Sequence, residues 1–470
     1  MSEFHSKTLE IYILSFSLKI VDLKLLFWYF KSNVKKLPTR GFYMRNVYHI
    51  DKAPPEVNKI SKNTKYIIIS LYALSLIIFG LFLDSPQNIL IGLKQIIIEP
   101  DLLITDYIGV GGLGAAFVNS GLITLLFILF LYRLKLELYG TAIAALFIIA
   151  GFSFFGKNLF NVWFIIIGVY LYSRFQRETF SRYIYIALFG TALAPLTTEL
   201  LFTIAQPLYV RIPLATLTGL AMGFILPPLS TFLLRVHEGF SLYNVGFTAG
   251  LIGTVFMSIF KSLGMLPEQR MVWTTGNNYM LFIFLFSMFI SMIIIGYLLN
   301  NKSFRGVKDI TEYPGRMVTD FVQIQGFSPT LINMGICGII AIVYIVLVNG
   351  DINGPTIAGI FTIVGFSAFG KHPKNILPIF LGVYLGSLAS IWKINDPRIL
   401  LAALFGTTLA PISGEFGWKY GALAGFLHSS IVLNIGVLHG GINLYNNGFA
   451  GGLVAAFLVP IIEVFRKDDN

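Results

Sequence analysis

The sequence predicts an all-α, polytopic transmembrane protein with two inverted repeats of about seven membrane segments each, some of them re-entrant or broken. Composition is the first reason, because 56% of the residues are hydrophobic and 12% are charged, whereas an ordinary soluble domain is about one quarter charged. The second reason is a succession of apolar runs after residue 64, most of them long enough to cross a bilayer. The third is that the chain repeats itself. We therefore expect the lipid bilayer to surround most of the chain.

Residues 1–63 form a basic amino-terminal arm in this prediction. Of the 34 Lys and Arg residues, 12 lie within the first 65 positions, which is typical of a segment that faces the cytoplasm. The apolar stretch at 10–30 is interrupted by Lys19, Asp22 and Lys24, which suits an interfacial helix better than a span, although the sequence leaves both open. No basic face is left over to form a nucleic-acid footprint, so we expect no nucleic acid as a partner.

The repeat is visible as three matched stretches. Residues 147–173 match 361–387 at 15 of 27 positions without gaps, at an offset of 214 residues. Residues 186–199 match 402–415, and residues 237–250 match 439–452. We therefore divide the chain into a first membrane repeat at 64–263, an inter-repeat loop at 264–276, a second membrane repeat at 277–465 and a tail at 466–470.

Seven apolar segments in the first repeat lie near 66–83, 112–131, 140–154, 160–173, 182–199, 212–234 and 243–261. An odd number of crossings inserts the second repeat upside down relative to the first, which gives an inverted repeat. The segments at 140–154 and 160–173 are short for a full crossing, so a re-entrant hairpin stays open there. Such a hairpin would leave the parity unchanged.

Loop charges also favour the inversion, because equivalent loops on opposite sides should differ in Lys and Arg. The loop with Arg133 and Lys135 corresponds to residues 348–354, which contain neither residue type. The segment after the first span carries only Lys94, whereas its counterpart at 300–316 carries four basic residues. Both differences place the two termini in the cytoplasm, in a multi-pass protein of the cell membrane.

Polar residues that both repeats retain are the candidate substrate-binding residues, because a buried unpaired polar or charged group is costly in lipid. They are Lys157, Lys371, Asn161, Asn375, Glu199, Glu415, His237, His439, Tyr243, Tyr445, Asn244 and Asn446. Glycine-rich sequences lie next to them (FGK, FGT, HEG and HGG) and predict helix breaks inside the membrane. The free backbone groups of such breaks, and helix amino-termini above all, suit anionic or carbonyl oxygens.

Each candidate also has a structural interpretation. The lysines suit helix ends or headgroup contacts, the glutamates suit ion pairs with those lysines, and the histidines suit helix caps. The tyrosines suit interfacial packing, and the asparagines suit hydrogen bonds between helices. The sequence leaves these alternatives open beside a role in solute binding.

The FGK…N…GVYL and LYNxGFxxG pairs resemble an uncharacterised bacterial family of polytopic membrane proteins, a domain of unknown function. A fainter resemblance links residues 116–129, 154–158 and 240–244 to bacterial urea transporters, whose halves are also inverted repeats. This second resemblance implies that Asn119 lies near a helix break and that Ser241 and Asn244 belong to a pore helix. Asn333, the repeat partner of Asn119, becomes a candidate with them.

These observations predict a membrane transporter or channel for a small polar solute, a urea-like neutral solute or a small anion, with its pathway between or within the two repeats. The alternative is a membrane-embedded enzyme that uses Glu199, His237, Glu415 and His439 as acid-base groups. We expect no enzyme, because no HExxH or GxSxG motif occurs. Three further possibilities stay open: a structural or assembly role without transport, a homo-oligomer, and proton coupling.

The single cysteine, Cys337, excludes an intrachain disulfide, and we expect no cofactor and no metal.

Overall fold

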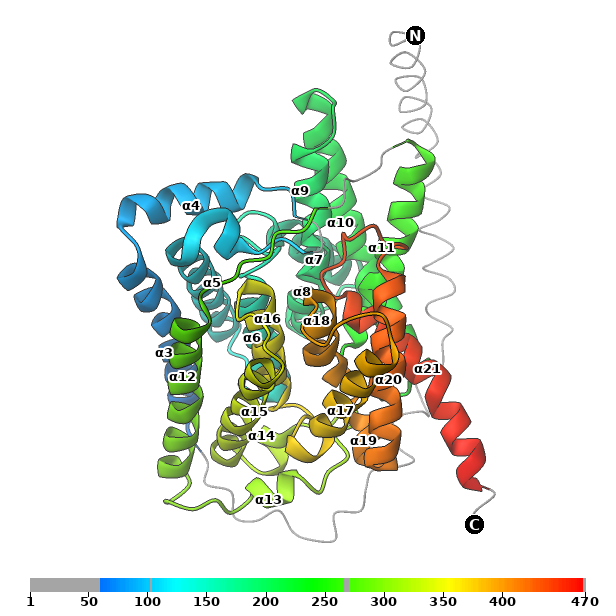
Figure 1. Ribbon diagram of the computed structural model, residues 1–470. Coiled ribbons are helices and arrows are strands. Elements are labelled where there is room, and N and C mark those ends of the chain that lie inside the picture. The colour runs from blue at the N-terminus through cyan, green and yellow to red at the C-terminus, as the bar shows by residue number, and fades with distance from the viewer. Residues whose placement is uncertain (1–59, 102–103, 265–269, 468–470) are drawn as a thin grey trace. The chain divides into compact units, whose positions relative to one another are not determined.

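The computed structural model describes residues 60–101, 104–264 and 270–467 (Figure 1). We call 60–264 the first half and 270–467 the second half. Within the described ranges the chain forms helices joined by turns, with an isolated β-bridge between Thr105 and Val272. The predicted interfacial helix at 10–30 lies outside these ranges.

The first half contains α3 (Lys62–Leu83), α4 (Pro86–Ile98), α5 (Tyr107–Arg133), α6 (Gly140–Phe152), α7 (Val162–Phe175), α8 (Ile184–Gly190), α9 (Ala194–Phe202), α10 (Leu208–Leu233) and α11 (Asn244–Ser262). The second half contains α12 (Asn278–Leu299), α13 (Val307–Ile310), α14 (Phe321–Ile324), α15 (Phe327–Leu347), α16 (Gly354–Phe366), α17 (Pro373–Ala389), α18 (Pro397–Gly406), α19 (Ala410–Phe416), α20 (Trp418–Ile435) and α21 (Asn446–Lys467). Short 3₁₀ turns connect α8 to α9 and α18 to α19.

Among the described residues, nine helices, with α8–α9 and α18–α19 each counted as one, are long and apolar enough to cross a membrane. The predicted class of all-helical, polytopic membrane protein is therefore confirmed. Helices α6 and α16 are only 13 residues long and are buried on nearly every side. An all-round apolar helix of this kind belongs in the interior of a helical assembly. Whether α6 and α7 form a re-entrant hairpin in the bilayer stays a prediction.

Helix α4 was not predicted, because the residues after the first span were expected to form a loop. The Ser85 hydroxyl accepts a hydrogen bond from the Asn88 amide, and Pro86 occupies the first helical position, which are common signals for a helix start. Ile89 and Ile96 are buried, and α4 packs on α5. The prediction of a loop was wrong because 13 residues are too few to span and give a weak hydropathy signal.

The predicted glycine-rich breaks separate helices in both halves. Gly156 and Gly370 have positive φ, 90° and 116°, between the short helices α6 or α16 and the helices that follow. A further matched break occurs at Gly112 inside α5 (φ 86°, ψ 165°) and at Gly326 before α15 (φ 90°, ψ 167°), 214 residues apart. Glycine adopts this backbone geometry without the strain that a Cβ would cause.

Equivalent helices of the two halves run antiparallel where they meet. Along α3 and α12, the Tyr72 hydroxyl contacts Ser291 and the Phe79 ring stacks on Phe284 at 4.1 Å. Residue numbers therefore rise along one helix as they fall along the other. Figure 1 shows α3 and α12 side by side, with α4 at one end of this pair and α13 toward the other.

Helices α6 and α16 pack together in the same antiparallel sense. Gly151 lies against Ala358, and Gly365 lies against Ala144 and Phe147. Residue numbers therefore also rise along α6 as they fall along α16.

Candidate functional site

Lys157 and Lys371 stand in equivalent turns after the two short interior helices. The Lys157 amide donates to the Phe152 carbonyl, and the Lys371 amide donates to the Phe366 carbonyl. Both side chains are fully buried, with no exposed area. A fully buried lysine is rare, so these two positions define the candidate site.

Each ammonium group is held by a tyrosine of the other half. Lys157 Nζ donates to the Tyr445 hydroxyl at 2.8 Å, and Lys371 Nζ donates to the Tyr243 hydroxyl. Lys371 also donates to Thr407 Oγ1 at 2.7 Å. The two hydrogen bonds to tyrosine therefore join the halves in a reciprocal manner.

Aromatic rings surround both ammonium groups. Lys157 Nζ lies 5.1 Å from the Phe152 ring centre and 4.9 Å from that of Tyr445. Lys371 Nζ lies 5.4 Å and 4.6 Å from the corresponding rings of Phe366 and Tyr243. Such distances give favourable cation–π contacts, which partly offset the lost hydration of the charge.

Asn119 and Asn333 hold the turns that carry the lysines. Asn119 Nδ2 donates to the Ser153 carbonyl (2.7 Å) and to the Lys157 carbonyl (3.0 Å). Asn333 Nδ2 makes the equivalent bonds to Ser367 and Lys371, both at 2.8 Å. Asn119 lies within α5, seven residues after the break at Gly112, so it supports the turn after α6 rather than a break of its own helix.

Asn161 and Asn375 close the same turns from the carboxyl side. Asn161 Nδ2 donates to the Gly156 carbonyl at 3.0 Å, and Asn375 Nδ2 donates to the Gly370 carbonyl at 2.9 Å. These asparagines therefore satisfy backbone groups beside the glycine with positive φ, and they position the lysines instead of contacting their ammonium groups.

The two histidines fix the starts of α11 and α21. His237 Nε2 lies 3.0 Å from Asn244 Oδ1, and Asn244 Nδ2 donates to the Ser230 carbonyl. His439 and Asn446 repeat this arrangement at 2.9 Å, with Asn446 Nδ2 bound to the Val432 carbonyl. The side chains of these residues therefore tie the last helix of each half to the helix before it.

Ser241 contributes to the contact between the halves. Its hydroxyl lies 3.2 Å from Thr408 Oγ1, which also accepts a hydrogen bond from the Tyr243 amide at 3.0 Å. The Leu242 amide donates to the Thr408 carbonyl, and the Leu444 amide donates to the Ala192 carbonyl. The turn before each final helix is thus docked on the broken helix of the opposite half.

Helices α11 and α21 begin at the same place between the halves. Gly246 and Gly448, each in the first turn of its helix, are in backbone contact, since a Cβ on Gly448 would lie 3.0 Å from the Gly246 Cα. Figure 1 shows the two helices leaving this contact toward opposite ends of the drawing. Their amino-terminal ends carry partial positive charge beside Tyr243 and Tyr445, the residues that bind the lysines.

The two glutamates that occur at equivalent positions of the repeats have different surroundings. Glu199 lies in α9 and is 5% exposed, whereas Glu415 lies in α19 and is partly exposed. Ion pairs among the described residues involve the five basic residues Lys65, Arg182, Arg270, Arg316 and Arg398. The lysines of the site therefore have hydroxyl groups as hydrogen-bond partners instead of the carboxylates that an ion-pair interpretation needs.

Asp101 was missed by the sequence analysis. This fully buried carboxylate accepts hydrogen bonds from Tyr107 (2.8 Å), Asn161 (3.1 Å) and Thr198 (3.2 Å). Burial in the loop between α4 and α5 raises the pKa of Asp101 to about 8. The repeat gave no signal for it, because Gly315 stands 214 positions later.

Thr407 and Thr408 were also missed. Thr407 lies in the FGT sequence that both halves share, with Thr191 as its counterpart, so the repeat could have identified it. Thr408 corresponds to Ala192, which offers no side-chain hydroxyl. The Lys371 side of the site is therefore the more polar one.

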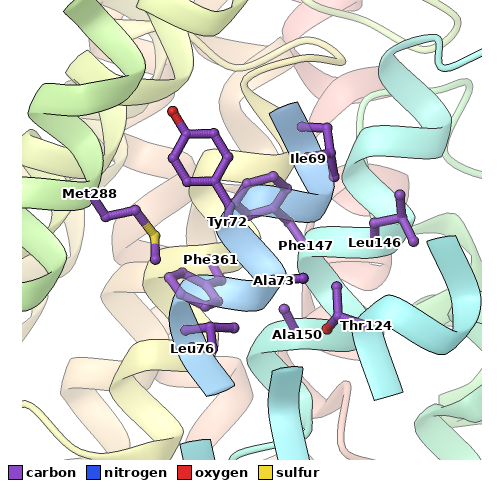
Figure 2. A pocket seen from close by; sticks show the side chains of 10 residues that line it. All are labelled: Ile69, Tyr72, Ala73, Leu76, Thr124, Leu146, Phe147, Ala150, Met288 and Phe361. Atoms are coloured by element: carbon purple, nitrogen blue, oxygen red, sulfur yellow. The ribbon is translucent and has the colours of Figure 1, made fainter. Parts of the chain in front are cut away.

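A small pocket of about 20 Å³ lies elsewhere, among α3, α5, α6, α12 and α16 (Figure 2). Its lining is apolar except for Tyr72 and Thr124, and Figure 2 shows the Tyr72 hydroxyl pointing away from the other lining side chains. The Thr124 hydroxyl donates to the Ser120 carbonyl of its own helix. No polar group is thus directed at a solute in this pocket, which argues for a packing gap.

Within the described residues, no group of three or more His, Cys, Asp and Glu side chains could hold a metal ion.

No curated protein and no solved structure matches the chain. One family model does match, at residues 85–262 and 299–464, which fall in the two halves and cover well over half of the sequence. The chain therefore belongs to the family described as "Protein of unknown function (DUF1576)".

Proposed function

We propose that this multi-pass helical membrane protein is a transporter or channel for a small polar solute, with its pathway between the two halves at Lys157 and Lys371. One observation carries the proposal, namely the reciprocal hydrogen bonds from these lysines to Tyr445 and Tyr243. Charged side chains in the interior of membrane proteins are costly and typically mark a substrate or ion pathway. A purely structural contact could be made by apolar side chains at lower cost.

We also propose that the two halves lie in the bilayer in opposite orientations. The antiparallel packing of α3 on α12 supports this orientation, as do the opposite loop charges. Both termini then lie on the cytoplasmic side of the cell membrane. Inverted halves of this kind allow alternating access, because two equivalent arrangements open the same site to either side.

The contacts between the halves suggest how the pathway opens. The site is closed in this structure, since both lysines are fully buried. Breaking the bond between Lys157 and Tyr445 would loosen one contact between the halves while the bond between Lys371 and Tyr243 holds the other. The two contacts would then open in turn, as alternating access needs.

Flux through the purified full-length chain in liposomes tests this function. Urea, glycerol, formate and nitrate would be offered in separate osmotic swelling experiments. We expect at least one of them to enter faster than into protein-free liposomes.

The double variant Lys157→Met with Lys371→Met should slow that entry by roughly tenfold or more, the factor that corresponds to about 1.4 kcal/mol. Lys65→Met is the matched control, because Lys65 pairs with Glu137 away from the site. Entry at the protein-free rate for all four solutes would contradict the proposal.

We propose transport in preference to catalysis. The histidines that an acid-base mechanism would use have their Nε2 atoms bound to Asn244 and Asn446, and this contact supports a role in fixing helix starts. The competing hypothesis makes a distinct prediction, since Glu199→Gln should abolish any lipid-modifying activity of the purified protein. Turnover of bilayer lipids that depends on Glu199 would favour the enzyme.

A further inference from the structure

Among the described residues, no carboxylate forms an ion pair with the ammonium group of either interior lysine. Their hydrogen bonds go to the hydroxyls of Tyr445, Tyr243 and Thr407. The ion pairs formed within the described part of the chain lie on other basic residues. A buried positive charge without a counter-charge is expensive, so a negative ion bound at either lysine would stabilise the charged form of that lysine.

The groups around the lysines compensate this charge only in part. Aromatic faces and hydroxyl oxygens offer partial negative charge, and they carry no full negative charge. The positive ends of α11 and α21 lie beside the hydroxyl partners, because these helices start at Asn244 and Asn446, directly after the two tyrosines. The partially negative carboxyl ends of α6 and α16 lie next to the lysines on the other side and offset their charge without supplying a full counter-charge.

We propose that this site binds small anions at the ammonium groups of Lys157 and Lys371. The anion class is that of small inorganic anions and short-chain carboxylates, which accept hydrogen bonds from ammonium and hydroxyl groups. Its identification as the transported solute rests on the function proposed above. Binding itself does not depend on transport and can be measured separately.

The geometry links anion binding to opening of the interface. An anion that reaches Lys157 takes the position on the ammonium group that the Tyr445 hydroxyl now occupies, since that hydroxyl is its hydrogen-bond partner. The bond between the halves is then broken by the solute itself. Because aromatic rings lie against the ammonium group, an anion of a few atoms would need less rearrangement of the site than a larger one.

The two positions are unequal. Lys371 has the Thr407 hydroxyl as a second partner, and this hydroxyl can stay in contact when the Tyr243 hydroxyl is displaced. Lys157 has the Tyr445 hydroxyl as its hydrogen-bond partner. We therefore expect the Lys371 position to bind the anion more tightly.

Thermal unfolding of the full-length protein in detergent tests binding without transport. Formate or nitrate is added at constant ionic strength, with gluconate as the replacement anion, and a short-chain phosphatidylglycerol is added in a separate series. We expect formate or nitrate to raise the Tm of the wild type by about 2 °C or more. The rise should be smaller in Lys157→Met, smaller still in Lys371→Met and absent in the double variant. The control Lys65→Met should keep it.

The outcomes separate this inference from the proposed function. A Tm rise that depends on the two lysines supports anion binding, and faster entry of the same anion into liposomes supports its transport. No Tm rise with either anion, a rise that survives in the double variant, or a rise with the lipid alone overturns the anion site, even if urea or glycerol is transported. Lys→Met removes a charge without a partner carboxylate, so the variants should fold, and their Tm without added anion reports this directly.

Discussion

Asn119 and Asn333 show how single side chains set the position of a charge. Each uses one amide group to satisfy two backbone carbonyls, and one of these carbonyls belongs to the lysine of the site. The turns after α6 and α16 leave carbonyls without helical partners, as helix ends do. A carbonyl buried without a hydrogen bond is costly, so the asparagines stabilise both the turn and the lysine within it.

Replacing these asparagines should therefore destabilise the protein. We expect Asn119→Leu and Asn333→Leu each to lower the free energy of unfolding by about 1–3 kcal/mol, because two buried carbonyls lose their donor. Thermal unfolding in detergent measures the change. Asn434→Leu is the comparison, since Asn434 is exposed and its amide donates to the Ser430 carbonyl within its own helix. Equal effects at the three positions would contradict this role.

Asp101 predicts a pH dependence of stability. Desolvation raises the pKa of this carboxyl to about 8 from its ordinary value of 3.8, so the folded protein keeps a proton that the unfolded chain loses. Glu99, Glu199 and Tyr107 face it, and the negative charge of the two glutamates acts in the same direction. The contribution of Asp101 to the free energy of unfolding should therefore be largest below about pH 4 and should decrease as the pH rises toward 8.

Asp101→Asn should remove that contribution. We expect the Tm of the wild type to fall more steeply between pH 5 and pH 8 than the Tm of the variant, in the same detergent and salt. Parallel Tm curves for the two proteins would show that Asp101 is ionised in the folded state throughout this range.

At the scale of helices, the short interior helices α6 and α16 are each capped by the opposite half. The Asp320 carboxylate accepts a hydrogen bond from the Gly140 amide at the start of α6 (3.0 Å), and Asp106 accepts one from the Gly354 amide at the start of α16 (3.2 Å). Each aspartate also caps its own helix. The carboxylates therefore combine a favourable charge–dipole contact with a link between the halves.

The two aspartates should differ in importance. Asp106 accepts from three amides, those of Ile108, Thr274 and Gly354, whereas Asp320 accepts from two, those of Gly140 and Gln323. We expect Asp106→Ala to destabilise the protein by about 1–3 kcal/mol and Asp320→Ala by less. Unfolding in detergent gives both values. Asp396 caps a helix of its own half by accepting a hydrogen bond from the Arg398 amide, so Asp396→Ala should have the smallest effect. A larger loss of stability for Asp320→Ala or Asp396→Ala than for Asp106→Ala would contradict this account.

Hydropathy and the repeat were sufficient to predict the long apolar helices of the first half from the sequence. The seven segments of the first half all appear as helices, and the breaks at FGK and FGT lie where glycine and proline suggest them. Helix α4 was missed because a short helix that lies on another helix needs no long apolar run. Bonds within a turn, such as Asn161 to Gly156, follow from local sequence, so these roles could have been inferred.

For the whole molecule, the sequence supplied the candidate residues and could not pair them. Lys157 and Tyr445 are 288 positions apart, and their contact depends on how the two halves pack. Both residues recur in the repeat, which identifies them individually and leaves their partners open. Asp101 has no counterpart in the second half, so a method based on repeats cannot find it. Packing between the two halves is therefore the information that only the structure provides.

The orientation of the two halves in the bilayer gives the last prediction. Gln87 and Asn301 are 214 positions apart, both are exposed, and each follows the first helix of its half. If the halves are inverted and both termini are cytoplasmic, residue 87 faces the outside and residue 301 faces the cytoplasm.

Single cysteines at these two positions test that arrangement, in a Cys337→Ala background that removes the buried native thiol. A membrane-impermeant maleimide should label Gln87→Cys in intact cells and leave Asn301→Cys unlabelled, and both should react once the cells are permeabilised. The opposite result, with only residue 301 labelled, would keep the inversion and reverse the side of the termini. Labelling of both positions from the outside would mean that the halves sit the same way up, and the two equivalent lysine–tyrosine contacts could then not open the site to opposite sides of the membrane.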